Sequence, residues 1–323
     1  MRTIELSVRA LVVTFLGTLA LAAPSTAQPW PQRSVRVIVP LPPGIPTDLV
    51  CRLFADRLSE QWRQPVVVEN RQGADGIPAV TGFVSGRDDH TLLCSFPGIV
   101  TINPLIYEKL PYDPSRDLVP VVSLSDNFIG IAVSAALKVD SLDDFVKLAR
   151  SQPGKLNWAA SPGNPLYGFA ALLKSAGIEM VQVSYRDFRP ALQDVGEGRI
   201  QAVATGVGVL LPQRDAGKVK LLMVYNRQRS PQAPEVPTAT EAGYPELTLE
   251  GLTGFYGWRD MPADVKERIA ADARAVAADP ALFERVATIG SVLRVGTSAE
   301  FAAVIEEQRA KIVAIAHTMK PTQ

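Results

Sequence analysis

The sequence is poor in the side chains that most enzymes and metal sites use. It contains two histidines and two cysteines among 323 residues, although histidine is the usual proton-transfer residue near neutral pH and both residue types are common zinc ligands. His90 lies in a charged loop and His317 near the end of the chain, and we expect both side chains to be exposed. The motifs Gly-x-Ser-x-Gly, His-Glu-x-x-His and the phosphate-binding P-loop are missing. These absences argue against an enzyme, a metal centre and a cofactor.

An excess of one charge is also missing. Lys and Arg together number 33, as do Asp and Glu, and the positive charges form no basic run. Proteins that bind nucleic acid or an anionic membrane surface concentrate positive charge. The balance therefore argues against nucleic acid as a partner and favours a small ligand or another protein.

Long apolar runs are absent from the chain after its N-terminal segment. No stretch there reaches the roughly 18 residues of a membrane helix. The N-terminus itself carries Arg2 and Arg9, an apolar run over residues 10–23, and the small residues Ser25-Thr26-Ala27. This pattern predicts a secretory signal peptide over residues 1–27, cleaved after Ala27. An uncleaved anchor helix is the less favoured alternative because the run is short. We therefore expect an exported, periplasmic protein.

The most informative stretch that is present runs from residue 35 to residue 71. Val35–Val39 predicts a strand, residues 40–46 a Gly/Pro loop, residues 47–62 an amphipathic helix and residues 65–71 a second strand. Such a βαβ unit predicts a parallel sheet covered by helices, which collects ligands at the carboxyl ends of its strands. We therefore expect the loops at residues 42–48 and 72–77 to meet at one site.

The rest of the chain alternates between strand-like and helical segments, which predicts an α/β fold. Two helices carry capping signals, Ser141 with Asp144 and Thr297 with Glu300. The further predicted strands cover residues 91–94, 118–123, 129–133, 156–159, 180–183, 202–205, 221–224 and 252–258.

Many of these segments carry motifs in a familiar order. The first are Pro40-Leu41-Pro42-Pro43-Gly44, Thr47-Asp48 and Pro65 to Gly76. The later ones are Thr91-Leu92-Leu93, Asn103-Pro104, Leu110 to Pro114, Asp117, Pro153 to Asn157, Pro190 to Leu192, Ala216 to Lys218, Arg229-Ser230, Val236 to Thr238 and Glu241 to Gly243. Together they resemble the receptors of tripartite tricarboxylate transporters, also called Bug proteins. The resemblance covers nearly the whole chain beyond Trp30.

This resemblance implies a two-lobed α/β periplasmic binding protein of the type II-like kind. On this chain the two crossover strands that join the lobes are expected near Ile129–Ser134 and Leu252–Trp258. Lobe one would comprise residues 28–130 and 252–323, and lobe two residues 131–251. A small ligand would then bind in the cleft between the lobes.

Three loops have the composition of a carboxylate site. Backbone N–H groups at a helix N-terminus or in a Gly-rich turn hold a carboxylate without a cationic side chain. Two of these loops are those at residues 42–48 and 72–77. The third follows the predicted strand at residues 156–159. In the alternative interpretation Gly and Pro only turn the chain, and Thr47 or Asp48 only caps the helix.

Three longer side chains could complete the pocket. Phe96 and Tyr167 could line it against an apolar ligand body or belong to the core. Arg186 could pair with a ligand carboxylate, although a salt bridge to Asp187 or Asp194 is the plainer interpretation. The predicted ligand-binding residues are Pro43, Gly44, Ile45, Pro46, Thr47, Asp48, Gly73, Ala74, Asp75, Gly76, Phe96, Ser161, Gly163, Asn164, Tyr167, Arg186 and Thr205.

Four positions depart from the pattern of the family. Ile45 and Pro46 replace a glycine and a small residue, and proline has no N–H to offer. Asp75 replaces a common glycine and places a carboxylate beside the expected carboxylate site, and Thr205 aligns with a family aspartate. We therefore hypothesise a ligand with fewer negative charges than citrate, which carries either an apolar body or a cationic group.

The two cysteines leave two interpretations open. Cys51 lies in the first turn of the first helix, and Cys94 ends a neighbouring strand. A disulfide near the ligand loops is conceivable in an exported protein. We favour two unbridged, buried residues, because the family fills these positions with small side chains.

The resemblance implies a receptor that closes over a small organic acid and delivers it to the membrane subunits of a tripartite tricarboxylate transporter. An orphan receptor that reports its ligand to a sensor kinase is an alternative. An exported α/β hydrolase is a less favoured one, since no His- or Cys-based catalytic group is evident.

Overall fold

The computed structural model describes residues 30–185 and 188–318. The predicted signal peptide, Arg186 and the side chain of His317 lie outside the described residues. Within the described part of the chain, no helix combines the length and apolarity that a membrane span requires. The fold described below belongs to residues 33–318.

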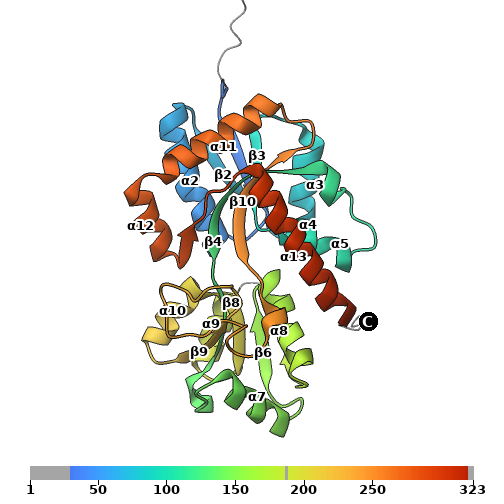
Figure 1. Ribbon diagram of the computed structural model, residues 1–323, viewed down its shortest axis with the longest axis vertical. Coiled ribbons are helices and arrows are strands. Elements are labelled where there is room, and N and C mark those ends of the chain that lie inside the picture. Colours follow the sequence, from blue (N-terminus) through green and yellow to red (C-terminus); the bar gives the residue numbers. More distant parts are fainter. Residues whose placement is uncertain (1–29, 186–187, 319–323) are drawn as a thin grey trace, which may run out of the picture. The chain divides into compact units, whose positions relative to one another are not determined.

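A six-stranded mixed sheet forms the centre of the first lobe, with strand order β11-β4-β10-β3-β1-β2 (Figure 1). β1, β2 and β3 are parallel, so their carboxyl ends lie at one edge of the sheet, and a predicted ligand-loop residue or segment follows each of them. β10 is antiparallel to both β3 and β4, and β11 is antiparallel to β4. The strands are β1 (Val35–Val39), β2 (Val66–Asn70), β3 (Thr91–Ser95), β4 (Leu118–Asn127), β10 (Gly251–Trp258) and β11 (Ser291–Leu293).

The longer helices cover this sheet because they present apolar side chains to it. In α2, which the sequence predicts to be amphipathic, the stripe of Val50, Phe54 and Leu58 is fully buried, and burying each such side chain contributes about 1.5–3 kcal/mol. Phe301 of α13 packs on Tyr256 of β10 with ring centroids 5.0 Å apart. The helices of this lobe are α2 (Pro46–Trp62), η2 (Ala74–Gly76), α3 (Ile77–Gly86), α4 (Gly98–Thr101), α5 (Asn103–Ile106), α6 (Pro114–Asp117), α11 (Ala263–Ala277), α12 (Pro280–Thr288) and α13 (Ser298–Thr318).

A five-stranded sheet forms the second lobe, with strand order β7-β6-β8-β5-β9. β6 is parallel to β7 and β8, so the chain segments that follow these strands begin at one edge of the sheet. Trp158 and Phe169 stack in its core with centroids 4.4 Å apart. Its elements are β5 (Ile129–Ser134), η3 (Ala135–Leu137), α7 (Leu142–Ser151), β6 (Asn157–Ala160), α8 (Asn164–Ser175), β7 (Val181–Gln182), α9 (Arg189–Gly196), β8 (Ala202–Gly206), α10 (Val207–Asp215), β9 (Val219–Val224) and η4 (Pro245–Leu247).

The chain passes from the first sheet to the second at Phe128, between β4 and β5, and returns between β9 and β10. The segments expected to cross, Ile129–Ser134 and Leu252–Trp258, form strands of the second and the first sheet respectively. The residue boundaries of the two lobes, as given by the sequence, remain a prediction.

The last helix contacts both lobes. Phe301 and Ile305 belong to the core around Tyr256, whereas Ile312 belongs to the core of the second lobe around Trp158. Between them, the side-chain amide of Gln308 meets Asn164 of α8 at 3.2 Å. Figure 1 shows α13 running from the first lobe towards α8, and the two helices are in contact.

Both predicted capping boxes are confirmed. The Ser141 hydroxyl accepts the N–H of Asp144 at 3.1 Å. The Thr297 hydroxyl accepts the N–H of Glu300 at 3.2 Å, and the Glu300 carboxylate accepts the N–H of Thr297 at 2.7 Å.

The favoured interpretation of the cysteines is wrong, because Cys51 and Cys94 form a disulfide with their Cα atoms 6.2 Å apart. Helix α2 packs on β3, and this packing brings the two fully buried cysteine side chains within bonding distance. The bridge ties the helix that follows the first ligand loop to the strand that precedes Phe96.

The expectation that His90 is exposed is also wrong, since its side chain is buried. His90 precedes β3, where its carbonyl accepts the N–H of Arg36 in β1 and draws the residue against the sheet. Asp88, Asp89 and His90 bring possible metal ligands within 4.8 Å of one another. Asp88 already accepts from Arg33, Thr91 and the N–H of His90, so we assign no metal here.

Candidate functional site

The first ligand loop is held in place by a buried carboxylate. Asp48, in the first turn of α2, is fully buried. Its oxygens accept from the N–H of Gly44 at 2.8 Å, Asn70 Nδ2 at 2.8 Å and Arg52 Nε at 3.1 Å. The loop therefore folds back on its own helix, and the N–H of Gly44 is already used. Asp48 has a structural role here, and it does not cap the helix with its side chain.

Thr47 joins a second buried group, at the point where the chain leaves the first sheet. Its hydroxyl lies 3.4 Å from both Asn127 Nδ2 and Thr253 Oγ1. The N–H groups of Thr47 and Asp48 precede the first helical bond of α2, which Leu49 donates to Ile45. Such first-turn N–H groups attract anions, so the start of α2 offers two donors even though Pro46 offers none.

The second ligand loop presents Asp75. Ala74 and Asp75 adopt left-handed backbone angles, with φ of 44° and 50°, which cost non-glycine residues about 1–3 kcal/mol each. Two contacts hold this conformation: Asn103 Nδ2 donates to the Asp75 carbonyl at 3.0 Å, and the Tyr107 hydroxyl donates to Asp75 Oδ2 at 2.5 Å. The Asp75 side chain is thus fixed from one side.

The Asp75 carboxylate helps to raise the pKa of two tyrosine hydroxyls. The hydrogen bond to Asp75 raises the pKa of Tyr107 to about 12. Burial, followed by the charges of Asp75 and Tyr107, raises the pKa of Tyr167 to about 12. Because Tyr167 belongs to α8, the Asp75 carboxylate acts on a residue of the second lobe.

Three of the contacts between loops of the two lobes involve predicted site residues. A Cβ on Gly163 would lie 2.6 Å from Cε2 of Phe96, so the ring can lie against the backbone here only because residue 163 has no side chain. A Cβ on Gly206 would lie 3.1 Å from Cγ of Pro46, and a Cβ on Gly44 would lie 3.5 Å from Nη2 of Arg189.

Burial sorts the predicted site residues into three groups. The exposed ones are Pro43, Gly44, Gly73, Ala74 and Asp75. The half-buried ones are Ile45, Pro46, Phe96, Ser161, Gly163 and Tyr167. The buried ones are Thr47, Asp48, Gly76, Asn164 and Thr205.

The buried residues hold the loops together. Asn164 Nδ2 donates to the carbonyl of Glu250 at 2.9 Å, which anchors the start of α8 to the segment that leads into β10. A Cβ on Gly76 would lie 2.8 Å from Cβ of Pro40, so the second loop packs on the first. Thr205 is the penultimate residue of β8, next to the Gly206 contact with Pro46.

A family profile described as "Tripartite tricarboxylate transporter family receptor" matches residues 50–320. The chain belongs to this receptor family. Protein BugT of Bordetella pertussis (strain Tohama I) is 33% identical to the receptor over 244 residues, which cover 74% of each chain.

Solved structures share the fold of the receptor. Rpa4515 of R. palustris, solved with adipate, has a TM-score of 0.83 and 27% identity, covering 90% of the receptor and 98% of that chain. MatC (Rpa3494) of Rhodopseudomonas palustris, with bound malate, has a TM-score of 0.80 and 25% identity, covering 89% and 100%. The receptor therefore has the two-lobed α/β fold of periplasmic binding proteins.

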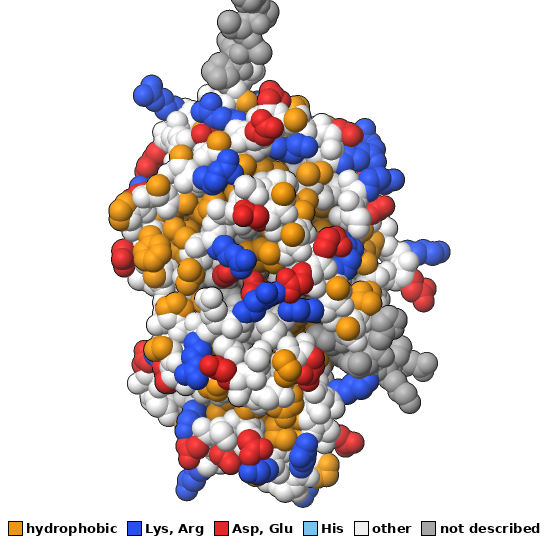
Figure 2. Space-filling model, in the orientation of Figure 1, with side chains coloured by type: hydrophobic (Ala, Val, Ile, Leu, Met, Phe, Trp, Pro, Cys, Tyr) orange, Lys and Arg blue, Asp and Glu red, His pale blue; other side chains and the backbone are white. Residues whose placement is uncertain are grey.

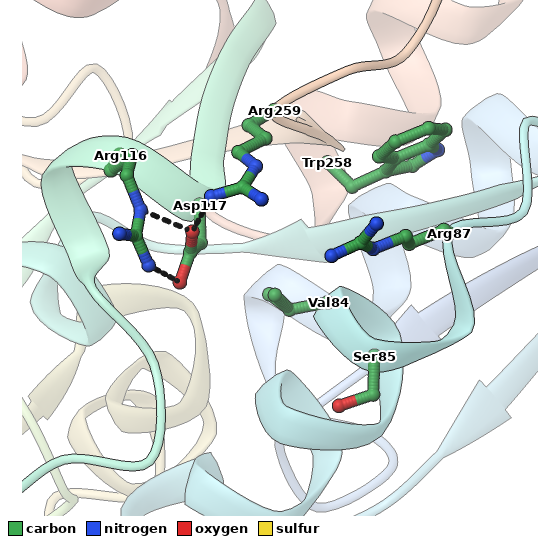
Figure 3. A pocket seen from close by; sticks show the side chains of 7 residues that line it. All are labelled: Val84, Ser85, Arg87, Arg116, Asp117, Trp258 and Arg259. Atoms are coloured by element: carbon green, nitrogen blue, oxygen red, sulfur yellow. Dashed lines mark hydrogen bonds and ion pairs between the residues drawn. The ribbon is translucent and has the colours of Figure 1, made fainter.

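Two of the hollows formed by the described residues of the receptor are relevant here, and both lie away from the contacts of Phe96, Pro46 and Gly44 with the second lobe. One, of about 420 Å³, is lined by Arg87, Arg116, Asp117 and Trp258 among others. Figure 3 shows Arg116 and Arg259 directed at the Asp117 carboxylate, with Arg87 on the far side of the hollow. Trp258 pairs with Leu118, four residues beyond the Gly254–Ser95 pair, so this hollow lies at the edge of the sheet opposite Phe96.

The other hollow, of about 370 Å³, adjoins the passage between the lobes. Arg294 contacts both Asp126 and Glu250 at 3.0 Å, and Arg227 contacts Glu250 at 3.4 Å. Burial raises the pKa of Asp126 in spite of Arg294. Both oxygens of Glu250 are taken by arginines, so we assign no ligand to this hollow.

Sequence reasoning missed Tyr107, Arg189 and Gly206 of the receptor. Tyr107 lies 32 residues from Asp75, and neither the composition nor the periodicity of the chain indicates their contact. Gly206 carried a usable signal, since it directly follows a predicted strand whose carboxyl end faces the site. The predicted Arg186 lies outside the described residues.

Proposed function

We propose that the protein is a periplasmic receptor that binds a small organic acid where the loops of the two lobes meet. The observation that carries this proposal is the set of contacts between lobes, Phe96 with Gly163, Pro46 with Gly206 and Gly44 with Arg189. A ligand held there touches both lobes, and binding energy shared between lobes favours a closed state. The relatives solved with adipate and malate support an organic acid as the ligand.

Helix N-termini supply the attraction for a carboxylate. α2 and α8 both begin at the meeting loops, and each helix carries about half a positive charge at its N-terminus. Arg189, at the start of α9, adds a full charge close to Gly44. One carboxylate is therefore well supplied with donors, even though Gly44 and Pro46 contribute none.

The hinge for closure would lie at Phe128 and in the segment that returns between β9 and β10. Asn226, after β9, braces this point: its Oδ1 accepts the N–H of Ile129 at 3.0 Å, and its Nδ2 donates to the carbonyl of Asn127 at 3.1 Å. Export through the predicted signal peptide and delivery to membrane subunits of a tripartite tricarboxylate transporter complete the proposal. Family membership supports this delivery, and it supports binding without turnover.

Thermal unfolding with a panel of mono-, di- and tricarboxylates, aromatic acids and amino acids tests the proposal. A ligand at 100 times its Kd adds about 2.7 kcal/mol of stability, which corresponds to a rise in Tm of roughly 5–10 °C for a chain of this size. We expect at least one saturable rise.

A matched pair of variants locates the binding site. Arg189→Ala is expected to weaken the binding of that acid at least tenfold, whereas Arg87→Ala, which removes a guanidinium from the hollow of Figure 3, leaves it unchanged. A folded, ligand-stripped protein that responds to no compound of the panel would contradict the receptor function. Equal losses in both variants would contradict the location.

A further inference from the structure

The site proposed for an acid contains an acidic side chain that points out of the protein fold. Asp75 is exposed, and its backbone is held in a left-handed conformation by Asn103 and Tyr107. A carboxylate needs no such strained loop to reach solvent. The strained backbone of the loop therefore fixes this charge at one position, at a cost in conformational energy.

The Asp75 carboxylate is only half used. Oδ2 accepts the Tyr107 hydroxyl, while no arginine, lysine or histidine among the described residues forms an ion pair with either oxygen. This contrasts with Asp48, whose two oxygens accept three hydrogen bonds. Oδ1 of Asp75 is thus left to accept a donor from outside the protein.

Tyr107 holds the Asp75 carboxylate from one side, and two further aromatic residues belong to the neighbouring loops. Tyr107 binds Asp75 directly, and Tyr167 lies close enough for the charge of Asp75 to act on its hydroxyl. Tyr167 lies about one turn of α8 beyond Gly163, against which the Phe96 ring packs. A carboxylate flanked by aromatic rings is the environment that binds ammonium and quaternary ammonium groups.

The opposite sign lies elsewhere in the same site. Arg189 and the start of α2 lie at Gly44, on the loop after β1, whereas Asp75 lies on the loop after β2. A plain dicarboxylate would satisfy the positive part and be repelled by the negative one. A ligand with one group of each sign satisfies both.

We propose that Asp75, Tyr107 and Tyr167 form a subsite for a cationic amino group, so that the receptor takes zwitterionic amino acids or betaines in preference to plain carboxylates. This inference rests on the proposed function. It names the class of ligand that the meeting loops select.

Calorimetry with matched ligand pairs tests the inference. Each pair consists of an amino acid and the same acid without its amino group, such as glutamate with glutarate and leucine with 4-methylpentanoate, and glycine betaine is tested with them. In the wild type, at least one amino-bearing member is expected to bind tenfold or more tightly than its partner.

Asp75→Asn is the informative variant, because asparagine also tolerates the left-handed backbone. It should weaken the amino-bearing ligand at least tenfold and leave the plain acid unchanged or tighter. Tyr107→Phe should give a smaller loss in the same direction. Asp143→Asn, at a carboxylate on α7 that is 73% exposed, is the control and should change neither affinity.

Three results are decisive. If plain acids bind and no amino-bearing partner binds more tightly, the subsite is refuted while the proposed function stands. If Asp75→Asn weakens both members of a pair equally, the effect is structural and the subsite is also refuted. If no acid of either kind binds the folded wild type, the proposed function itself fails.

Discussion

At the scale of single residues, Asp48 shows how one buried side chain shapes a predicted ligand loop. The carboxylate is fully buried and accepts hydrogen bonds from Gly44, Asn70 and Arg52. It thereby joins the end of β2, the loop and α2. Loss of the carboxylate would remove the acceptor of the Gly44 N–H and of Arg52 Nε, and would leave Asn70 Nδ2 with only the carbonyl of Leu41.

Asp48→Ala is therefore expected to lower the free energy of unfolding by about 2–4 kcal/mol. Urea denaturation measures this, and Asp56→Ala serves as the control because Asp56 is exposed on the same helix. The control is expected to stay within about 0.5 kcal/mol of the wild type. Equal stability of the two variants would show that the buried hydrogen bonds contribute nothing net.

The sequence indicates where these residues lie along the chain better than it indicates what they touch. Both Asp48 and Asp75 could be assigned to ligand loops because each follows a strand of a recognisable βαβ unit. Their different roles depend on partners 4, 22 and 32 residues away. The first separation is local and open to prediction, whereas the contacts with Asn70 and Tyr107 arise only when the sheet and α5 are in place.

At the scale of elements, the alternation of short apolar strands with amphipathic helices predicts most of the fold. The sequence does not predict β11, because three residues at the edge of a sheet are too few to show a periodic pattern. The sequence does not establish the disulfide for another reason, because a bridge depends on which face of α2 packs against β3. That face is defined only by packing.

The bridge closes a loop of 43 residues, for which the chain-entropy relation gives about 4 kcal/mol of stabilisation. Replacing both Cys51 and Cys94 by alanine should cost about this amount in urea denaturation without reductant. A reductant should destabilise the wild type by a similar amount and leave the double variant unchanged. Wild-type stability that ignores the reductant would contradict the bridge.

At the scale of the whole molecule, α13 makes the two lobes depend on one another. Its first half belongs to the core around Tyr256 and its second half to the core around Trp158. Gln308 lies between these halves and donates to the carbonyl of Glu250 at 3.0 Å, just before β10. Any closure about Phe128 must therefore carry one end of α13 with it.

Ile312→Ala should uncouple the lobes, because it empties a fully buried position in the second core, at a cost of about 2–5 kcal/mol. Hydrogen exchange followed by mass spectrometry should show faster exchange in peptides from β6 and α8, with those from β1 and β3 unchanged. Val313→Ala, at the partly buried neighbouring position, should have a smaller effect. Uniformly faster exchange in both lobes would contradict this division.

The Cys51–Cys94 bridge also affects when the receptor becomes stable. Thiols stay reduced in the cytoplasm and oxidise after export. A precursor carrying the predicted signal peptide would therefore lack the covalent tie between α2 and β3 while it awaits translocation, and would unfold more readily for passage across the membrane. The mature receptor would gain that tie on arrival, at the edge of its own ligand loops. Oxidation would thus add the stability of the bridge only after export, when the chain no longer has to unfold.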